Sequence, residues 1–383
     1  MPRGTPIRAA VVAFCTLAAY FHVTRYTSWA APQRFTPQSE ETPESLGAGA
    51  ASVHAALTPP PGAPAQALTP PPGAPAEAAQ YIVRWAGGEC TRSSASSLDD
   101  CCLAEWRRNT ESGDRQVRVV AARAGDVLFR MAVYESGDIV SQEIADKQLW
   151  ESKMTIDVLG ALRAVPVRTD TAGVALLDVG ANIGWFTWAA AVNGHGVRAF
   201  EPFRQNINLM RATACLNPDV ARRVQLHALG LGNETKTCYM VSETHINLGD
   251  GHTVCDPPHD VTKLPRGYQI IGKTPVRQLD QVWDDAAVSV MKMDTEGYEL
   301  FVLKGSNEVF SSSRGPRVLF TEFSPRMIRE RASEPAELLR FLKHHGYTCD
   351  RGALDGSEDA YVARLGSGVA DLRCERSANV EKL

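Results

Sequence analysis

Acidic side chains recur at the ends of apolar runs in the second half of the chain. Asp178 ends VALLDVG, Glu201 ends VRAFEP, Asp294 ends VSVMKMD, and Glu322 lies near the end of RVLFTEF. Each run is typical of a buried β-strand. In an open α/β sheet a ligand binds beyond the carboxyl ends of the strands, so the four carboxylates are predicted to meet at one site. A single acid in such a place is as readily a helix cap or a solvated loop residue.

A glycine-containing turn follows the first run. Gly180 and Gly184 allow a tight turn and a close approach to a ligand, and Asn182 tolerates an unusual backbone angle or donates a hydrogen bond. Glu201 ends the neighbouring strand, where a carboxylate can accept both hydroxyls of a ribose. DVGANIG departs from GxGxxG, and no GxxxxGK[ST] occurs. The pattern therefore favours a nucleoside without a pyrophosphate, of which S-adenosylmethionine is the common example.

Six blocks of the sequence resemble the FkbM family of S-adenosylmethionine-dependent methyltransferases over roughly residues 130 to 325: LLDVGANIGWFT, AFEPFRQN, HALGLGNE, VRQLD, MKMDTEGYELFVLKGS and RVLFTEF. The resemblance implies a class I methyltransferase fold, with a doubly wound, mainly parallel seven-stranded sheet and a reversed last hairpin. It implies S-adenosyl-L-methionine as cofactor and, usually, a hydroxyl oxygen as methyl acceptor. The cofactor contacts it implies are Asp178, Gly180, Asn182, Gly184 and Glu201.

Methyl transfer from a sulfonium is an in-line displacement, so the protein must align the two reactants, exclude water and remove a proton. Asp294, at the strand end that faces the methyl group, is the predicted base. Lys292 and Glu322 complete the predicted catalytic set, and Glu296 is a predicted substrate-binding residue. Lys292 is two residues from Asp294, so a structural ion pair is an equal alternative.

The resemblance extends to the preamble VSQEIADKQLWE, which implies that Trp150 and Glu151 close over the substrate side of the site. Thr295 stands where the family more often has an aliphatic residue. Glu299 is expected to begin the next helix, as a capping or solvated acid.

Strand and helix patterns alternate after residue 171, which predicts a doubly wound α/β domain over residues 171–366. Residues 81–170 are predicted to form a lead-in subdomain, with one or two strands in 117–134 and helical spacing over 141–162. Residues 367–383 are assigned to a C-terminal tail.

The first eighty residues are typical of an export signal followed by a spacer segment. The apolar segment 9–23 follows Arg3 and Arg8, and no acid precedes Glu40, so residues 1–30 are predicted to be a signal anchor or signal peptide. Residues 31–80 are predicted to be a disordered Pro/Ala-rich stalk, because ALTPPPGAPAQ is repeated as ALTPPPGAPAE. A type II protein of the Golgi or endoplasmic reticulum, with a lumenal catalytic domain, is the favoured reading. An organellar transit peptide is the alternative.

The nine cysteines form no paired CxxC blocks and have no histidine at zinc-ligand spacing, so no metal site is predicted. Cys90, Cys101 and Cys102 are the first candidates for disulfides in a lumenal domain. Cys215 and Cys238 are expected to be buried free thiols. Asn233-Glu234-Thr235 is the one N-glycosylation sequon in the chain.

The 383-residue chain has a formal net charge of −4, and its basic residues form no stripe in the sequence. This distribution argues against nucleic-acid binding. The expected partner is a small molecule or a glycan hydroxyl, and the membrane is contacted only through the N-terminal anchor. The alternatives are an organellar or soluble methyltransferase acting on a small metabolite or lipid, a silent binding module of the same fold and, most distantly, a nicotinamide oxidoreductase. The sequence leaves the oligomeric state open.

Overall fold

The computed structural model describes residues 82–83, 101–103, 116–165, 173–243, 252–255 and 268–377. They all belong to one compact unit, Pro70–Leu383. The predicted anchor 1–30 and stalk 31–80 lie outside the described residues. Within these ranges the chain has no helix whose length and apolar character would allow it to cross a membrane.

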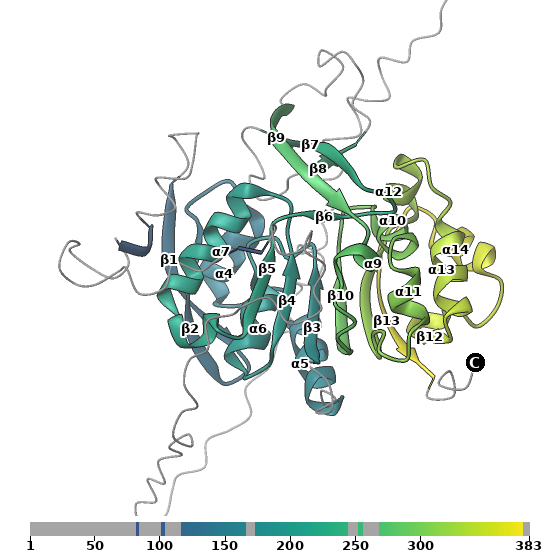
Figure 1. Cartoon of the computed structure of the whole chain (residues 1–383), viewed down its shortest axis with the longest axis horizontal. Coiled ribbons are helices and arrows are strands. Elements are labelled where there is room, and N and C mark those ends of the chain that lie inside the picture. Colours follow the sequence, from purple (N-terminus) through teal and green to yellow (C-terminus); the bar gives the residue numbers. More distant parts are fainter. Residues whose placement is uncertain are drawn as a thin grey trace, which may run out of the picture. The chain divides into compact units, whose positions relative to one another are not determined.

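A seven-stranded sheet is the centre of the described molecule (Figure 1). Its spatial order is β12 (Tyr347–Cys349), β13 (Ala370–Arg376), β11 (Val318–Phe323), β10 (Val288–Met293), β3 (Val174–Val179), β4 (Val197–Phe200) and β5 (Val224–His227). Only β13 runs antiparallel to its neighbours. Every residue of β3 and β10 is buried, as expected for parallel strands covered on both faces. The predicted class I fold is confirmed.

Helices cover both faces of the sheet. α6 (Trp185–Val192) packs on β3 and β4, and α5 (Ser152–Ala164) packs on β10 and α6. The other face is covered by α9 (Leu279–Val282), α10 (Glu299–Lys304), α11 (Asn307–Ser311) and α13 (Pro335–His344), whose apolar residues join one core cluster with Met291 and Met293. α12 (Pro325–Glu330) and α14 (Glu358–Leu365) pack on α13.

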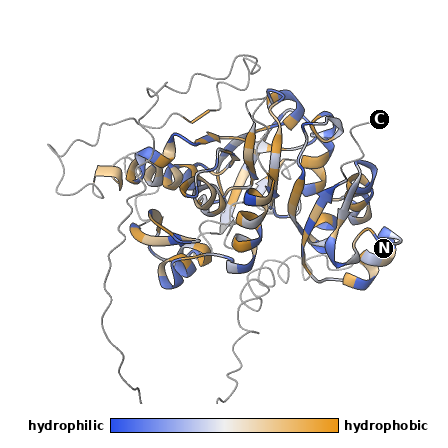
Figure 2. Ribbon diagram, turned by 90° about the horizontal axis from the view of Figure 1, so that it is seen from below, coloured by the Kyte–Doolittle hydropathy of each residue, from blue (hydrophilic) through white to orange (hydrophobic). Residues whose placement is uncertain are grey.

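Several helices carry both hydrophobic and hydrophilic residues, as the colours along their ribbons in Figure 2 show. α13 is the clearest case, because Leu338, Leu339 and Leu342 are fully buried while Arg340 is exposed. His344 is the last residue of this helix.

A hairpin and two helices precede the sheet. β1 (Val117–Ala124) pairs with β2 (Val127–Tyr134), and α4 (Ile139–Lys147) precedes α5. The helical spacing predicted as one segment is divided because Gln148 and Glu151 have left-handed backbones, with φ of 62° and 42°. β2 lies on α7 (Arg204–Leu216), where the Ala132 N–H donates to the Thr213 hydroxyl.

A second sheet lies between β5 and β10 in the sequence, and no pattern in the sequence predicted it. Its order is β6 (Gly230–Leu231), β9 (Tyr268–Arg277), β7 (Lys236–Glu243) and β8 (His252–Val254). β6 begins three residues after β5 ends, so this sheet starts from the carboxyl end of the central sheet. The short helix α8 (Pro218–Ala221) connects α7 to β5.

The structure corrects the predicted C-terminal boundary. Residues 367–383 were assigned to a tail, but β13 lies between β12 and β11 and pairs with both. The segment ADLRCER buries alternate residues, which is the two-residue period of a strand with one more polar face.

The free-thiol prediction for Cys215 and Cys238 is wrong. The structure has three disulfides between described cysteines: Cys102–Cys215, Cys238–Cys255 and Cys349–Cys374. Cys101 is also disulfide-bonded, as expected, whereas Cys90 lies outside the described residues. Apolar surroundings suit a buried thiol and a buried disulfide equally, so sequence context alone could not separate the two.

Candidate functional site

The loop after β3 has the backbone that its glycines predict. Gly180, Asn182 and Gly184 all have left-handed backbones, with φ of 76°, 54° and 92°. A Cβ on Gly180 would lie 1.9 Å from the carbonyl oxygen of Asp294. The close approach that requires this glycine is therefore one between two chain segments, and it brings the loop after β3 against the loop after β10.

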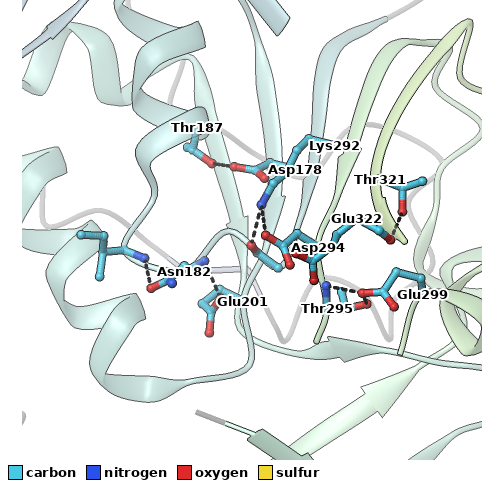
Figure 3. Close-up of polar contacts among 12 residues, drawn as sticks. Asp178, Asn182, Thr187, Glu201, Lys292, Asp294, Thr295, Glu299, Thr321 and Glu322 are labelled. Atoms are coloured by element: carbon cyan, nitrogen blue, oxygen red, sulfur yellow. Dashed lines mark hydrogen bonds and ion pairs between the residues drawn. The ribbon is translucent and has the colours of Figure 1, made fainter. Parts of the chain in front are cut away.

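Glu201 joins the same loop to the end of β4. Its Oε2 accepts the Asn182 N–H at 2.7 Å (Figure 3), and its Oε1 accepts the Phe203 N–H at 2.8 Å. Burial raises the pKa of Glu201 to about 7, although these two N–H donors act in the opposite direction. Glu201 is thus a buried carboxylate held by two backbone N–H donors and the Asn206 side chain, and its contact with the cofactor stays a prediction.

Asp178 is fully buried and faces the protein interior. Its Oδ2 accepts the Thr187 hydroxyl at 2.6 Å. Burial raises its pKa, opposed by the charge of Lys292 and by Thr187. The side chain has no exposed surface, and its Oδ1 has no hydrogen-bond partner among the described residues. The predicted contact of Asp178 with the cofactor stays a prediction.

Lys292 connects Asp178 to Asp294. The strand register places Lys292 opposite Asp178, and its Nζ lies 3.5 Å from Asp294 Oδ2, 3.4 Å from the Gly180 carbonyl oxygen and over the Phe186 ring. Burial alone lowers the pKa of Lys292, but the carboxylates of Asp294, Asp178 and Glu151 outweigh it and the pKa is raised. Lys292 is therefore a buried cation, and the ion pair with Asp294 exists.

Asp294 is the exposed end of this chain of charges. Its side chain is 37% exposed, whereas that of Lys292 is 9% exposed. The N–H of Asp294 donates to the Val179 carbonyl, which continues the parallel pairing of β10 with β3 for one more residue. A carboxylate in this position can accept a proton from a molecule outside the protein.

Glu299 builds the loop that follows Asp294. It begins α10, as predicted, but it is 1% exposed, so the expectation of a solvated acid is wrong. Its Oε1 accepts the Thr295 N–H, the Thr295 hydroxyl and the Gly297 N–H at 2.8, 3.0 and 3.2 Å. Burial raises the pKa of Glu299, and the hydrogen bonds from Thr295 act in the opposite direction. Thr295, the departure from the family pattern, thus supplies a hydroxyl that Glu299 uses.

The remaining predicted residues lie around this centre. Glu151 is close enough to Lys292 to raise its pKa, and Trp150 is 7% exposed beneath the start of α5. The Glu296 carbonyl accepts from Arg331 at 3.4 Å. Glu322 is half-buried on β11 and is drawn with the other acids in Figure 3. The structure therefore brings Glu151, Lys292 and Asp294 together, while Trp150 has little surface to offer a substrate.

Thr187 is a site residue that the sequence reasoning missed. It lies on α6, whose other residues in WFTWAAAV are apolar and almost all buried. A lone hydroxyl in such a helix needs a buried partner. That signal was available in the sequence, but the identity of the partner depends on how α6 packs on β3.

Residues 178–349 match the family model described as the Methyltransferase FkbM domain. The FkbM methyltransferase from Methylobacillus flagellatus KT is 22% identical with a TM-score of 0.31, and the match covers 46% of this chain and 39% of that one. The precorrin-6y C5,15-methyltransferase from Geobacter metallireducens GS-15 is 14% identical with a TM-score of 0.27, covering 53% and 75%.

The tRNA (uracil-54, C5)-methyltransferase from Pyrococcus abyssi, in complex with S-adenosyl-L-homocysteine, is 11% identical with a TM-score of 0.28. That match covers 56% of this chain and 37% of the other. The match thus spans less than two fifths of the Methylobacillus chain and of the Pyrococcus chain. No curated protein matches the chain.

Proposed function

We propose that this chain transfers a methyl group from S-adenosyl-L-methionine to a hydroxyl oxygen, because residues 178–349 belong to the FkbM methyltransferase family. The match to this family confirms the predicted family and enzyme class. The favoured acceptor is a sugar hydroxyl of a glycan. One observation carries the proposal: a partly exposed carboxylate, Asp294, is paired with the buried Lys292 directly beside the loop after β3.

The residues at the end of β4 fit the ribose of this cofactor. Glu201 accepts two backbone N–H groups and a hydrogen bond from the Asn206 side chain, and a carboxylate has about four lone-pair sites, so acceptor capacity is left for a ribose hydroxyl. Asn182 lies against that carboxylate, and Gly180 and Gly184 complete the turn. When bound, S-adenosyl-L-methionine supplies a methyl group already activated by its sulfonium.

Asp294 is the group we assign to the acceptor proton. As the acceptor oxygen attacks, its O–H bond breaks and Asp294 takes the proton. Lys292 holds this carboxylate in place from the buried side and balances the charge of Asp178. Glu296, Glu322 and Glu151 are assigned to the acceptor side. Alignment of the reactants can lower the barrier by about 7 kcal/mol or more.

The disulfides favour an oxidising compartment for the catalytic domain. All seven described cysteines are disulfide-bonded, and such bonds are rare in the cytosol. Together with the predicted anchor and stalk, this supports a type II protein of the Golgi or endoplasmic reticulum. A lumenal enzyme meets glycans as its commonest hydroxyl-rich acceptors, which is why a sugar hydroxyl is preferred to a small metabolite or lipid.

The test combines cofactor binding with turnover in the full chain. In calorimetric titration, wild-type protein is expected to bind S-adenosyl-L-methionine saturably and to show no binding of NAD. It is also expected to transfer a labelled methyl group to glycans in an isolated pool. Asp294→Asn should lower turnover by about 10²- to 10⁴-fold, the usual contribution of a general base, and leave cofactor affinity unchanged.

Asp126→Asn is the matched control, because Asp126 is an exposed acid in the turn between β1 and β2. It should leave both readouts unchanged. Full turnover in Asp294→Asn would remove Asp294 from the mechanism. Cofactor binding without methyl transfer to any acceptor class would instead favour a silent binding module.

A further inference from the structure

The turn between β6 and β7 carries the one Asn-x-Thr sequon of the chain, Asn233-Glu234-Thr235. Glu234 and Thr235 are exposed, and Asn233 is half-buried. The methyl-transfer site uses none of these three residues. The proposed reaction therefore does not depend on the side chains of this turn.

The backbone of this turn is fixed while the Asn233 side chain is not engaged. The Asn233 carbonyl accepts from Gln278 Nε2 at 2.9 Å, and the Gly232 N–H donates to the Arg277 carbonyl at 3.0 Å. Within the described residues, the Asn233 carboxamide makes no hydrogen bond. Thr235 donates its hydroxyl to Gln281 from an exposed position. The fold thus holds the main chain of the turn and leaves the amide nitrogen free for a substituent.

The turn also lies away from the site. Gly305, which follows α10, packs so closely on Gly232 that a Cβ there would be 1.9 Å from the Gly232 carbonyl oxygen. Glu299, which holds the site loop, is at the other end of α10. The six-residue helix, which begins with Glu299 and ends just before Gly305, rises about 9 Å. A substituent on Asn233 therefore begins on the turn, at the other end of α10 from Glu299.

We propose that Asn233 is an N-glycosylation site. The amide nitrogen forms an N-glycosidic bond to the first sugar of a lipid-linked glycosyl diphosphate, the bond from that sugar to the diphosphate breaks, and the amide loses a proton. The lipid diphosphate is the leaving group. The inference rests on the proposed lumenal compartment and not on methyl transfer, so the two can fail separately.

The experiment uses the full chain expressed in eukaryotic secretory cells. Treatment with peptide:N-glycosidase is expected to remove one glycan, seen as a single mobility shift, and to convert Asn233 to Asp, read by peptide mass spectrometry. Asn233→Gln and Thr235→Ala should abolish the shift. Thr235→Ser, which keeps the sequon, should retain it.

Asn193→Gln is the control for loss of an asparagine outside any sequon, and it should leave the shift unchanged. Methyl transfer by Asn233→Gln is expected to equal that of the wild type. An unmodified Asn233 in protein whose cysteines are oxidised would overturn the proposal. So would recovery of the chain only in reduced form, because lumenal delivery would then be absent.

Discussion

Glu201 makes cofactor binding dependent on pH. Its pKa is raised to about 7 by burial, and a ribose hydroxyl is accepted best by the ionised carboxylate. Below pH 7 the folded protein holds this group protonated, so ionising it must accompany binding. Affinity for S-adenosyl-L-methionine should therefore fall by about tenfold for each pH unit below 7 and be constant above it. Calorimetric titration between pH 6 and 8 measures this directly.

Glu201→Gln removes the ionisable group while keeping a similar shape. It should bind the cofactor more weakly at pH 8, with an affinity that no longer varies with pH. Glu334→Gln is the control, because Glu334 is exposed and its side chain makes no capping hydrogen bond. A pH dependence that survived in Glu201→Gln would show that another group titrates.

At the scale of elements, Gly180 is the contact that joins β3 to β10. Gly180→Ala would introduce a left-handed alanine and place its Cβ 1.9 Å from the Asp294 carbonyl oxygen. The left-handed backbone costs about 1–2 kcal/mol, and forcing the two loops apart adds about 1–3 kcal/mol. We expect a loss of about 2–5 kcal/mol of unfolding free energy in urea titration, together with loss of cofactor binding.

Gly194→Ala separates strain from crowding. Gly194 follows α6 with φ of 92°, and nothing lies within 4 Å of the Cβ it would gain. Gly194→Ala should therefore lose only the cost of a left-handed alanine, about 1–2 kcal/mol of unfolding free energy, and it should still bind the cofactor. Equal losses in the two glycine variants would mean that the contact between the loops is unimportant.

At the scale of the whole molecule, disulfides tie distant parts of the chain together. Cys102–Cys215 closes 113 residues and attaches the segment 101–103 to α7, whereas Cys349–Cys374 closes 25 residues between two adjacent strands. The chain-entropy relation gives about 5 kcal/mol for the long loop and about 3.5 kcal/mol for the short one. The double variant Cys102→Ala/Cys215→Ala should therefore lose more stability than Cys349→Ala/Cys374→Ala.

Urea unfolding of both double variants, under conditions that keep the other disulfides intact, measures the difference. Alanine is used because Cys102 and Cys374 are fully buried, and a serine hydroxyl there would need a partner. A larger loss in the Cys349/Cys374 variant would mean that native packing between β12 and β13, and not loop closure, dominates.

The sequence by itself determined the α/β fold and the set of chain segments that form the site. Apolar runs of strand length, each followed by helical spacing, can bury themselves only as parallel strands covered on two faces. The acids at the ends of those runs then meet at one edge, because the carboxyl ends of parallel strands share it. The left-handed turn at Gly180, Asn182 and Gly184 was likewise readable from residue types alone.

Only the tertiary structure decided which of these side chains are free to act. Asp178 and Asp294 both end apolar runs in the sequence, yet Asp178 is fully buried against Thr187 and Asp294 is 37% exposed. The pairing of Cys102 with Cys215 and the place of β13 inside the sheet were also beyond sequence patterns. The physical reason is the same in each case: exposure and pairing depend on neighbours that the chain brings from far along the sequence.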